Sequence, residues 1–402
     1  MLRLLSMLLL ALAVTDWRLV SVQDMRRVLD PTHGDGTSGV LSPDGSTIAW
    51  TAGAMLCLYT LADESYACLS PYEVDIPLAT PVWSPDSQRI AFTEALAGVP
   101  NAPTTSLSLV YESDVWVFDV AQQRLSNISD DGFSGVWNTE TDALLNPTIG
   151  LDIAPAWNPV TGDLLYFSIL QNTLVLYQVT DGIPEQLFVV SFDLNYSLGE
   201  NPFARLARLS ATVSPDGRQI AITWLPAEGD WGLFLLDSAR PGRWTHLVEA
   251  DDLRVGLPTW SEAAMVPYHV EWAQHGLLIS AESEGDSQNS LPTMAYFVAL
   301  PQGAVQPLVD VSNMWQPDAS GVIAQLPRDA VVAPDGMTAL YIGFDSTNTL
   351  ADVYALALPP AGQRPVLLRT ILDFGCCVTN HQLSRSDSGQ VLSYGYLLTY
   401  ER

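Results

Sequence analysis

The chain alternates between short apolar runs and tight polar turns along almost its whole length. In each recurrence an apolar residue leads into a turn of the Ser-Pro-Asp-Gly type, and a run with alternating apolar positions follows. A period of two residues is typical of β-strands, and no segment after the N-terminus shows the 3.6-residue period of an amphipathic helix. The copies are "LSPDGSTIAW" from Leu41, "WSPDSQRIAF" from Trp83, "WNPVTGDLLYF" from Trp157, "VSPDGRQIAI" from Val213, "VEWAQHGLLIS" from Val270 and "VAPDGMTALYI" from Val332.

Each copy is followed by a second strand-like run, such as "SDVWVFDV" from Ser113, and then by a shorter one, such as "RLSNIS". Each unit therefore consists of four strands. A single four-stranded sheet cannot bury both of its faces, but units that stack side by side in a closed ring bury the faces of one another. The sequence contains seven such units. Five are marked by turn prolines at 43, 85, 159, 215 and 334, the sixth is a degenerate copy near 274, and the seventh is a partial copy that begins at Ser384. We predict an all-β fold, a seven-bladed β-propeller of four-stranded antiparallel blades, as a single domain over residues 15–402.

The last unit has room for only two strands before Arg402. Two further strand-like runs, "WRLVSVQ" from Trp17 and "MRRVLD" from Met25, precede the first complete unit. We predict that these N-terminal strands join the last blade and close the ring.

The turn itself has a stereochemical explanation. Proline presets φ at the first central position, aspartate suits the second, and glycine takes the left-handed conformation that returns the chain to a strand.

The phrase "PVWSPDSQRIAFTE" followed by "SDVWVFDV" resembles the repeat of TolB-type, WD-repeat-like β-propellers, which also occurs in the propeller domains of prolyl oligopeptidase and dipeptidyl peptidase relatives. Six of the seven units match it to some degree. The resemblance implies the fold and does not imply an activity, because propellers carry many unrelated functions.

Strand order places the two tight turns of each unit at one face and the longer connections at the other. The connections are residues 94–112, 127–152, 191–209, 249–267, 281–292 and 310–329, and we refer to them as the long-loop face. Loops longer than about 12 residues are usually functional or disordered. We expect them to form an acidic and aromatic rim around a central channel. The candidate binding residues on it are Tyr111, Asp130, Asp131, Trp137, Tyr196, Arg205, Trp315 and Arg328.

The net charge of the chain disfavours some classes of binding partner. The formal net charge is −28, and all 17 basic residues are arginines. Phosphate-backbone binding relies on clustered Lys and Arg, so nucleic acid is an unfavourable partner. The absence of lysine also excludes a Walker-type phosphate loop and Schiff-base chemistry.

The N-terminal segment has the anatomy of a secretory signal. One arginine precedes an apolar run from Leu4 to Val14 that contains Ala11-Leu12-Ala13. The run is too short to span a bilayer, which needs about 20 apolar residues. We predict a signal peptide over residues 1–14, a mature chain without a transmembrane span, and a periplasmic or extracellular location.

The positions of the four cysteines agree with those of an exported protein that contains a disulfide. Cys57 and Cys68 lie in two alternating runs around a polar turn, where a hairpin would bring them within disulfide distance. Cys376 and Cys377 are adjacent, which leaves three alternatives open: a vicinal disulfide, two buried thiols, or partners for the other pair.

The sequence shows no motif that is typical of a catalytic site. The chain has no Gly-x-Ser-x-Gly elbow, and its five histidines lack metal-ligand spacing. No cofactor is indicated, and the sequence does not decide whether a metal binds. It favours a non-catalytic, monomeric propeller that binds a protein or glycan partner in the cell envelope. Two alternatives stay open: a glycan- or lactone-cleaving propeller with carboxylates or a metal at the channel mouth, and a stand-alone sensor related to peptidase propellers.

Overall fold

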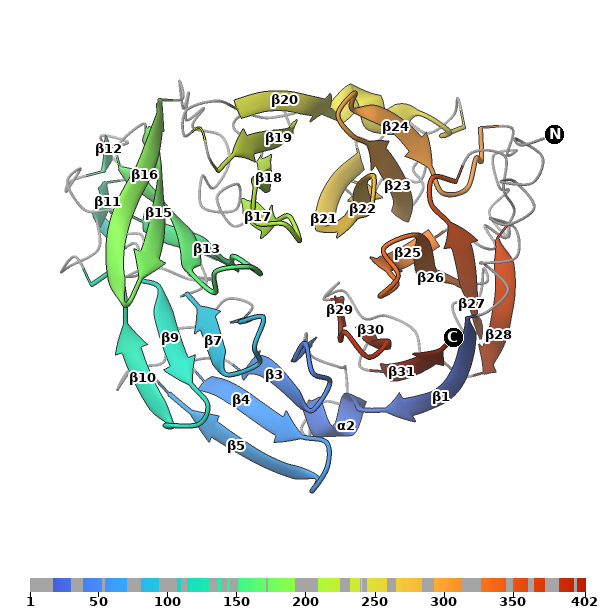
Figure 1. Ribbon diagram of the computed structural model, residues 1–402, viewed down its shortest axis with the longest axis horizontal. Helices are drawn as coiled ribbons and strands as arrows, with labels where there is room; N and C mark the ends of the chain where they lie inside the picture. Colours follow the sequence, from blue (N-terminus) through green and yellow to red (C-terminus); the bar gives the residue numbers. More distant parts are fainter. Residues whose placement is uncertain are drawn as a thin grey trace. The chain divides into compact units, whose positions relative to one another are not determined.

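The computed structural model describes residues 17–29, 39–52, 55–70, 81–93, 107–109, 114–130, 136–138, 143–144, 151–170, 173–191, 209–224, 232–238, 240, 244–258, 265–283, 293–312, 327–344, 350–360, 365–372, 383–393 and 396–402. Within these ranges the strands form seven four-stranded sheets and one three-stranded sheet. Each four-stranded sheet corresponds to one predicted unit, and its strands pair antiparallel in a meander (Figure 1). The fold is a seven-bladed β-propeller.

The chain divides into two compact units, residues 42–247 and residues 1–41 with 248–402. Blades 1 to 4 occupy the first of these units, apart from strand β2 and the end of β20. Their strands are β2 (Gly39–Leu41), β3 (Thr47–Ala52), β4 (Met55–Thr60) and β5 (Ser65–Leu69); β6 (Val82–Trp83), β7 (Arg89–Phe92), β9 (Trp116–Asp119) and β10 (Arg124–Asn127); β13 (Leu151–Trp157), β14 (Leu164–Leu170), β15 (Thr173–Thr180) and β16 (Ile183–Ser191); β17 (Ser210–Val213), β18 (Gln219–Trp224), β19 (Gly232–Asp237) and β20 (Trp244–Glu249).

Blades 5 to 7 belong to the other unit. Their strands are β21 (Met265–Ala273), β22 (Gly276–Ser283), β23 (Thr293–Ala299) and β24 (Ala304–Pro307); β25 (Pro327–Val332), β26 (Thr338–Phe344), β27 (Leu350–Ala357) and β28 (Val366–Leu372); β29 (Ser384–Arg385), β30 (Gln390–Ser393), β31 (Tyr396–Glu401) and β1 (Arg18–Asp24). None of the described helices is long and apolar enough to cross a membrane.

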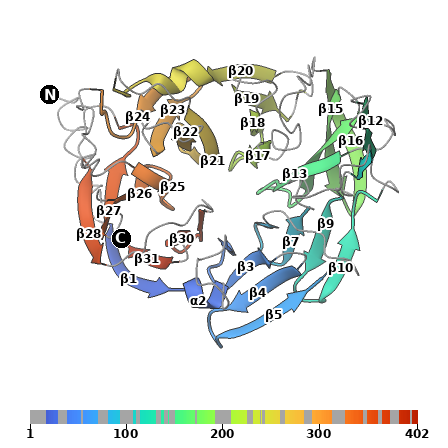
Figure 2. The ribbon, with the colours of Figure 1, turned by 180° about the vertical axis from the view of Figure 1, so that it is seen from behind.

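The last blade combines the two ends of the chain. Strand β1 is its outermost strand and pairs antiparallel with β31, from Arg18 opposite Glu401 to Asp24 opposite Tyr396 (Figures 1 and 2). This confirms that N-terminal sequence completes the last blade. The C-terminus supplies three strands rather than the two we expected, because β29 needs only two residues.

The second N-terminal run is a short helix, α2 (Arg26–Leu29), so the prediction that it forms a strand is wrong. Met25 and Leu29 lie one helical turn apart, and both are almost completely buried. The amide of Leu29 donates to the carbonyl oxygen of Met25 at 2.9 Å. Burial of two apolar side chains at i and i+4 favours a helical turn over the strand that we predicted.

The turn glycines have the predicted left-handed conformation, with φ of 74° at Gly45 and 73° at Gly217. The serine that begins the motif has a role we did not predict. The Ser214 hydroxyl donates to Asp216 at 2.6 Å and accepts from the amide of Gln219 at 2.9 Å. Hydrogen bonds from Ser214 and from the amide of Arg218 lower the pKa of the Asp216 carboxyl. The turn is therefore a closed hydrogen-bond network as well as a set of backbone preferences.

Neighbouring turns also contact one another within each unit. In the unit of residues 42–247, the amide of Asp44 donates to Ser87 Oγ at 3.1 Å, and Arg89 Nη2 donates to the carbonyl of Gly162 at 3.0 Å. In the other unit, the amide of Gln274 donates to the carbonyl of Gly336 at 2.8 Å. These bonds join blades 1 to 2, 2 to 3 and 5 to 6 at their turn ends.

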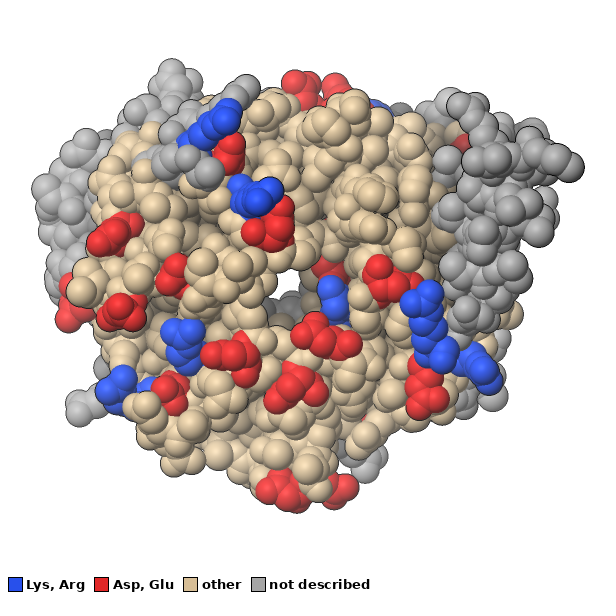
Figure 3. Space-filling model, viewed as in Figure 1, with Lys and Arg blue, Asp and Glu red and all other residues tan. Residues whose placement is uncertain are grey.

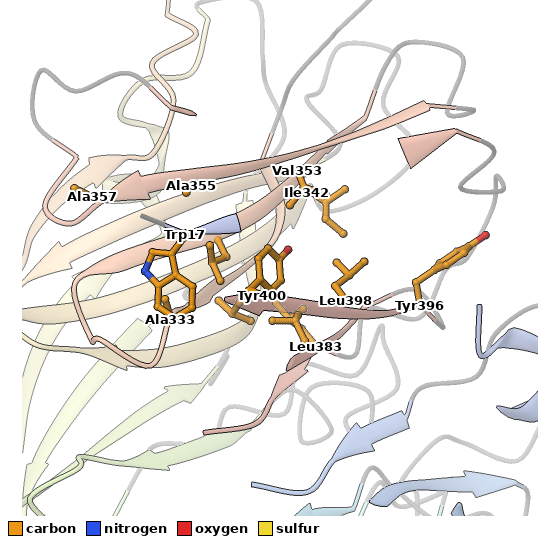
Figure 4. Close-up of a cluster of buried hydrophobic side chains, with 13 residues drawn as sticks. Trp17, Ala333, Ile342, Val353, Ala355, Ala357, Leu383, Tyr396, Leu398 and Tyr400 are labelled. Atoms are coloured by element: carbon orange, nitrogen blue, oxygen red, sulfur yellow. The ribbon is translucent and has the colours of Figure 1, made fainter. Parts of the chain in front are cut away.

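Trp17 fixes the N-terminal strand to blades 6 and 7. Its side chain is 6% exposed and belongs to an apolar cluster with residues of both blades, including Ile342, Val353 and Tyr400 (Figure 4). Its Nε1 donates to Asp335 Oδ2 at 3.0 Å, in the turn of blade 6. Trp17 therefore combines apolar burial with a hydrogen bond to a neighbouring blade.

We predict that Trp17→Ala lowers the free energy of unfolding by about 3–5 kcal/mol, since it removes a buried aromatic side chain. Trp17→Phe should cost less, because it keeps much of the burial and loses mainly the hydrogen bond to Asp335, worth about 1 kcal/mol. The matched control is Val20→Ala on the adjoining strand β1, where the side chain is 45% exposed and the cost should stay within about 0.5 kcal/mol. Urea denaturation measures all three. If Trp17→Ala is as mild as Val20→Ala, the N-terminal strand does not depend on Trp17.

Candidate functional site

The predicted binding residues fall mostly on connections whose side chains the structure does not describe. Tyr111, Asp131, Tyr196, Arg205 and Trp315 lie outside the described residues, as do Cys376 and Cys377. Trp137 and Arg328 lie on strands β11 and β25, where only the backbone is described. Asp130 is an exposed residue three positions after β10. Their roles in binding stay predictions.

The backbone shows an element that the repeat pattern did not predict. Three short strands, β8 (Leu107–Leu109), β11 (Val136–Asn138) and β12 (Ala143–Leu144), form a separate sheet in the order β12-β11-β8. We call it the accessory sheet. Its central strand β11 places Trp137 opposite Ser108 on one side and Leu144 on the other.

The accessory sheet is made entirely from long connections. Strand β8 lies in the connection between the second and third strands of blade 2, and β11 and β12 lie in the connection from blade 2 to blade 3. Both connections leave from the same end of blade 2, because its strands alternate in direction. Two of the six connections of the long-loop face are thus joined by backbone pairing rather than standing separately.

A third connection, residues 249–267, is described over residues 249–258, which pack along blade 5. It contains a short 3-10 helix, η1 (Ala250–Arg254). The Tyr296 hydroxyl on β23 donates to the carbonyl of Leu253 at 2.5 Å, and the amide of Val311 donates to the carbonyl of Gly256 at 3.0 Å.

Gly256 allows this close packing. Its φ is +77°, and a Cβ there would lie 2.5 Å from the ring of Pro307 at the end of β24. This part of the connection therefore lies against the third and fourth strands of blade 5.

Within the unit of residues 1–41 and 248–402, a charged cluster joins the first strands of blades 5, 6 and 7. Arg385 Nε on β29 donates to Oε1 of Glu271 on β21, and the amide of Val332 on β25 donates to Glu271 Oε2 at 2.8 Å. His269 Nε2 lies 3.9 Å from Glu271 Oε2, close enough for an ion pair and too far for a hydrogen bond. We call Glu271, Arg385 and His269 the first-strand cluster.

The surroundings of Glu271 hold it in the ionised form. Its side chain is only 16% exposed, and this burial by itself would raise the pKa of the carboxyl. The Arg385 guanidinium, His269 and the Val332 amide outweigh burial, so the pKa of Glu271 lies below its ordinary value. A carboxylate with a lowered pKa and both oxygens engaged is a poor general base at neutral pH. The cluster is therefore suited to joining blades rather than to proton transfer.

The repeat pattern marks two residues of this cluster as unusual, although we did not predict the cluster from it. Glu271 occupies the position held by Val82 and Val331 in other copies of the motif, and Arg385 occupies the position of Val332. A charge at a position that is apolar in most other copies requires a partner. Single-sequence reasoning could flag each residue, but it could not pair two residues 114 positions apart.

Figure 3 shows how charge is distributed on one face of the molecule. Acidic side chains are scattered over the described part of this face, several of them beside a basic side chain, and they do not merge into one patch there. Among the described residues, no three His, Cys, Asp or Glu side chains are grouped closely enough to hold a metal ion.

Comparisons with known proteins agree with this architecture. No protein-family model matches the chain, and no curated protein matches it in sequence. A chain in the crystal structure of the mitotic checkpoint complex is similar over 96% of this chain and 91% of its own length, with 12% identity and a TM-score of 0.50. At this identity the likeness concerns the fold alone. The chain is a β-propeller.

Two prokaryotic propellers are also similar, with lower scores. The propeller domain of the trilobed protease from Pyrococcus furiosus is matched over 88% of this chain and 90% of its own length, at 11% identity and a TM-score of 0.45. TolB from Acinetobacter baumannii is matched over 79% of this chain at 12% identity and a TM-score of 0.40. This chain covers 62% of the TolB chain, which is less than two thirds of its length.

We predict that Glu271→Gln lowers the free energy of unfolding at pH 7 by about 3 kcal/mol, since Arg385 loses its partner in a mostly buried site. Replacing both residues, as Glu271→Gln with Arg385→Met, should restore part of that loss. Glu185→Gln on the exposed surface of β16 is the control and should change stability little.

The same variant should alter the pH dependence of stability. Because the pKa of Glu271 is lower in the folded state, its stabilisation is complete above the unfolded value of about 4.3. It is lost as the pH falls through the folded-state value. Stability between about pH 5 and pH 3 should therefore fall less steeply in Glu271→Gln than in the natural protein. Equal slopes in urea titrations would contradict the role assigned to Glu271.

Proposed function

We propose that this protein is an exported, non-catalytic β-propeller that binds a protein or glycan partner in the cell envelope through its long-loop face. The observation that carries the proposal is the accessory sheet, in which connections of blades 2 and 3 form structure of their own. Connections that only link blades need few residues, and long ones in compact domains are usually functional or disordered.

The accessory sheet supports a binding role in particular because it gives the connections a defined backbone. Two connections held in fixed register lose less conformational entropy when a partner binds than two separate loops. The central strand also carries Trp137, a residue type enriched among the anchors of interfaces. Aromatic side chains at such positions suit both protein partners and the apolar faces of sugars.

The disulfide in blade 1 supports export. Cys57 on β4 and Cys68 on β5 are directly opposite, and they form a disulfide with a Cα–Cα distance of 4.1 Å. Structural disulfides persist in oxidising compartments and are rare in the cytosol. The predicted signal peptide, residues 1–14, lies outside the described residues and stays a prediction. The enzyme and sensor alternatives also stay predictions.

The binding role can be tested by capture from solubilised envelope extract of the source organism, with chemical crosslinking and mass spectrometry. The same protein is tested in parallel against immobilised envelope glycans. We expect Trp137→Ala, and a variant with residues 127–152 shortened, to retain on the order of tenfold less partner, as truncation of a hot-spot aromatic does.

Trp244→Ala provides the matched control. Trp244 lies on β20, away from the accessory sheet, and is 41% exposed. It should capture as much partner as the natural protein. If the Trp137 and Trp244 variants behave alike, or if shortening residues 127–152 leaves capture unchanged, the long-loop face is not the binding surface.

Export has its own test. The full chain should appear in the envelope or extracellular fraction, and N-terminal sequencing should show removal of about 14 residues. Placing a charge in the apolar run, as in Leu8→Arg with Leu9→Arg, should retain the protein in the cytoplasm with Cys57 and Cys68 reduced. An uncleaved chain in the cytoplasm from the natural sequence would rule out export, while leaving the binding role open.

A further inference from the structure

Strand β5 is held by very little side-chain packing. It is the edge strand of blade 1, and four of its five residues are exposed, including Tyr66 at 72%. Only Leu69 is partly buried. Hydrophobic burial, the main source of strand stability in a blade, therefore contributes little to keeping β5 in place.

Three other outer strands have a buried apolar side chain on the strand or directly beside it. Val248 on β20 is 1% exposed, and Leu308 directly after β24 is 4% exposed. The N-terminal strand β1 has Trp17 beside it, at 6% exposure. Blade 1 has no equivalent among the described residues of its outer strand, so another interaction must hold β5.

The disulfide supplies that interaction. Cys57 is 2% exposed on β4, so the bond ties the exposed strand to a buried position in the sheet. The remaining described contacts of β5 are its backbone pairing with β4 and the bonds from Ser65 to Asp63 Oδ1 in the adjoining turn. Exposed hydrogen bonds of this kind add little stability, because water replaces them readily.

We propose that the Cys57–Cys68 disulfide is a redox-sensitive crosslink that holds β5 on blade 1, and that its reduction releases the strand. A dithiol reductant supplies two electrons and two protons, the sulfur–sulfur bond breaks to give two thiols, and the reductant's own sulfurs become a disulfide. Release of β5 leaves the backbone groups of β4 unpaired along an open sheet edge. Such an edge pairs readily with another strand.

Hydrogen–deuterium exchange of the full chain, with and without a phosphine reductant, tests this proposal. We expect amides of residues 65–69 to exchange faster on reduction, by on the order of tenfold or more. Amides of β22 and β24 should keep their protection, which shows that the propeller remains folded. Unchanged exchange over residues 65–69 in fully reduced protein would overturn the proposal.

Two variants assign the effect to the right pair. Cys57→Ala with Cys68→Ala should show the fast exchange without reductant and should not respond to it. Cys376→Ser with Cys377→Ser should respond as the natural protein does. If the response is lost in this second variant, the Cys57–Cys68 bond is not responsible. The reductant experiment on the natural chain stands by itself should the alanine variant fail to fold.

Discussion

The burial of both faces of every blade is the constraint on which the rest of this structure depends. A twisted four-stranded sheet has two apolar faces and no means of covering them alone. Within each compact unit the apolar clusters accordingly extend from one blade to the next. One cluster joins blades 3 and 4, with Phe167 and Phe234 as its largest members. Others join blades 5 and 6, and blades 6 and 7. The stability of a blade is therefore largely a property of its neighbours.

Polar interactions supplement this packing near the C-terminal ends of the first strands. The turns are closed by serine and aspartate side chains and are bonded to the turns of neighbouring blades. The first-strand cluster adds a charged link across blades 5, 6 and 7, with Glu271 as its centre. Because these interactions stabilise the blades, the long connections can differ in length and sequence from one blade to the next. The same arrangement is typical of folds in which loops carry function on a rigid scaffold.

The repeat and its strands could be predicted from the sequence because their causes are local. Alternating apolar positions specify strands, and the sequence around Asp44 and Gly45 specifies a turn that any chain context would favour. The shortage of strands at the C-terminus likewise indicated that the N-terminus completes the last blade. Prediction failed at one short run near the N-terminus. We assigned the run from Met25 to a strand, although its apolar residues at 25, 28 and 29 have the spacing of a helical turn, which buries Met25 and Leu29 together.

The sequence by itself determined the fold class, the number of blades, the turn chemistry and the opposition of Cys57 and Cys68, because each follows from residues close together in the chain. Tertiary structure alone decided which distant segments meet. It paired β8 with β11 in the accessory sheet, and it brought Arg385 to Glu271 across 114 positions. It also showed that β5 lacks an apolar anchor, since burial depends on what surrounds a strand and not on the strand's own residues. Local rules are physical preferences of the backbone, whereas these contacts arise only when the blades pack.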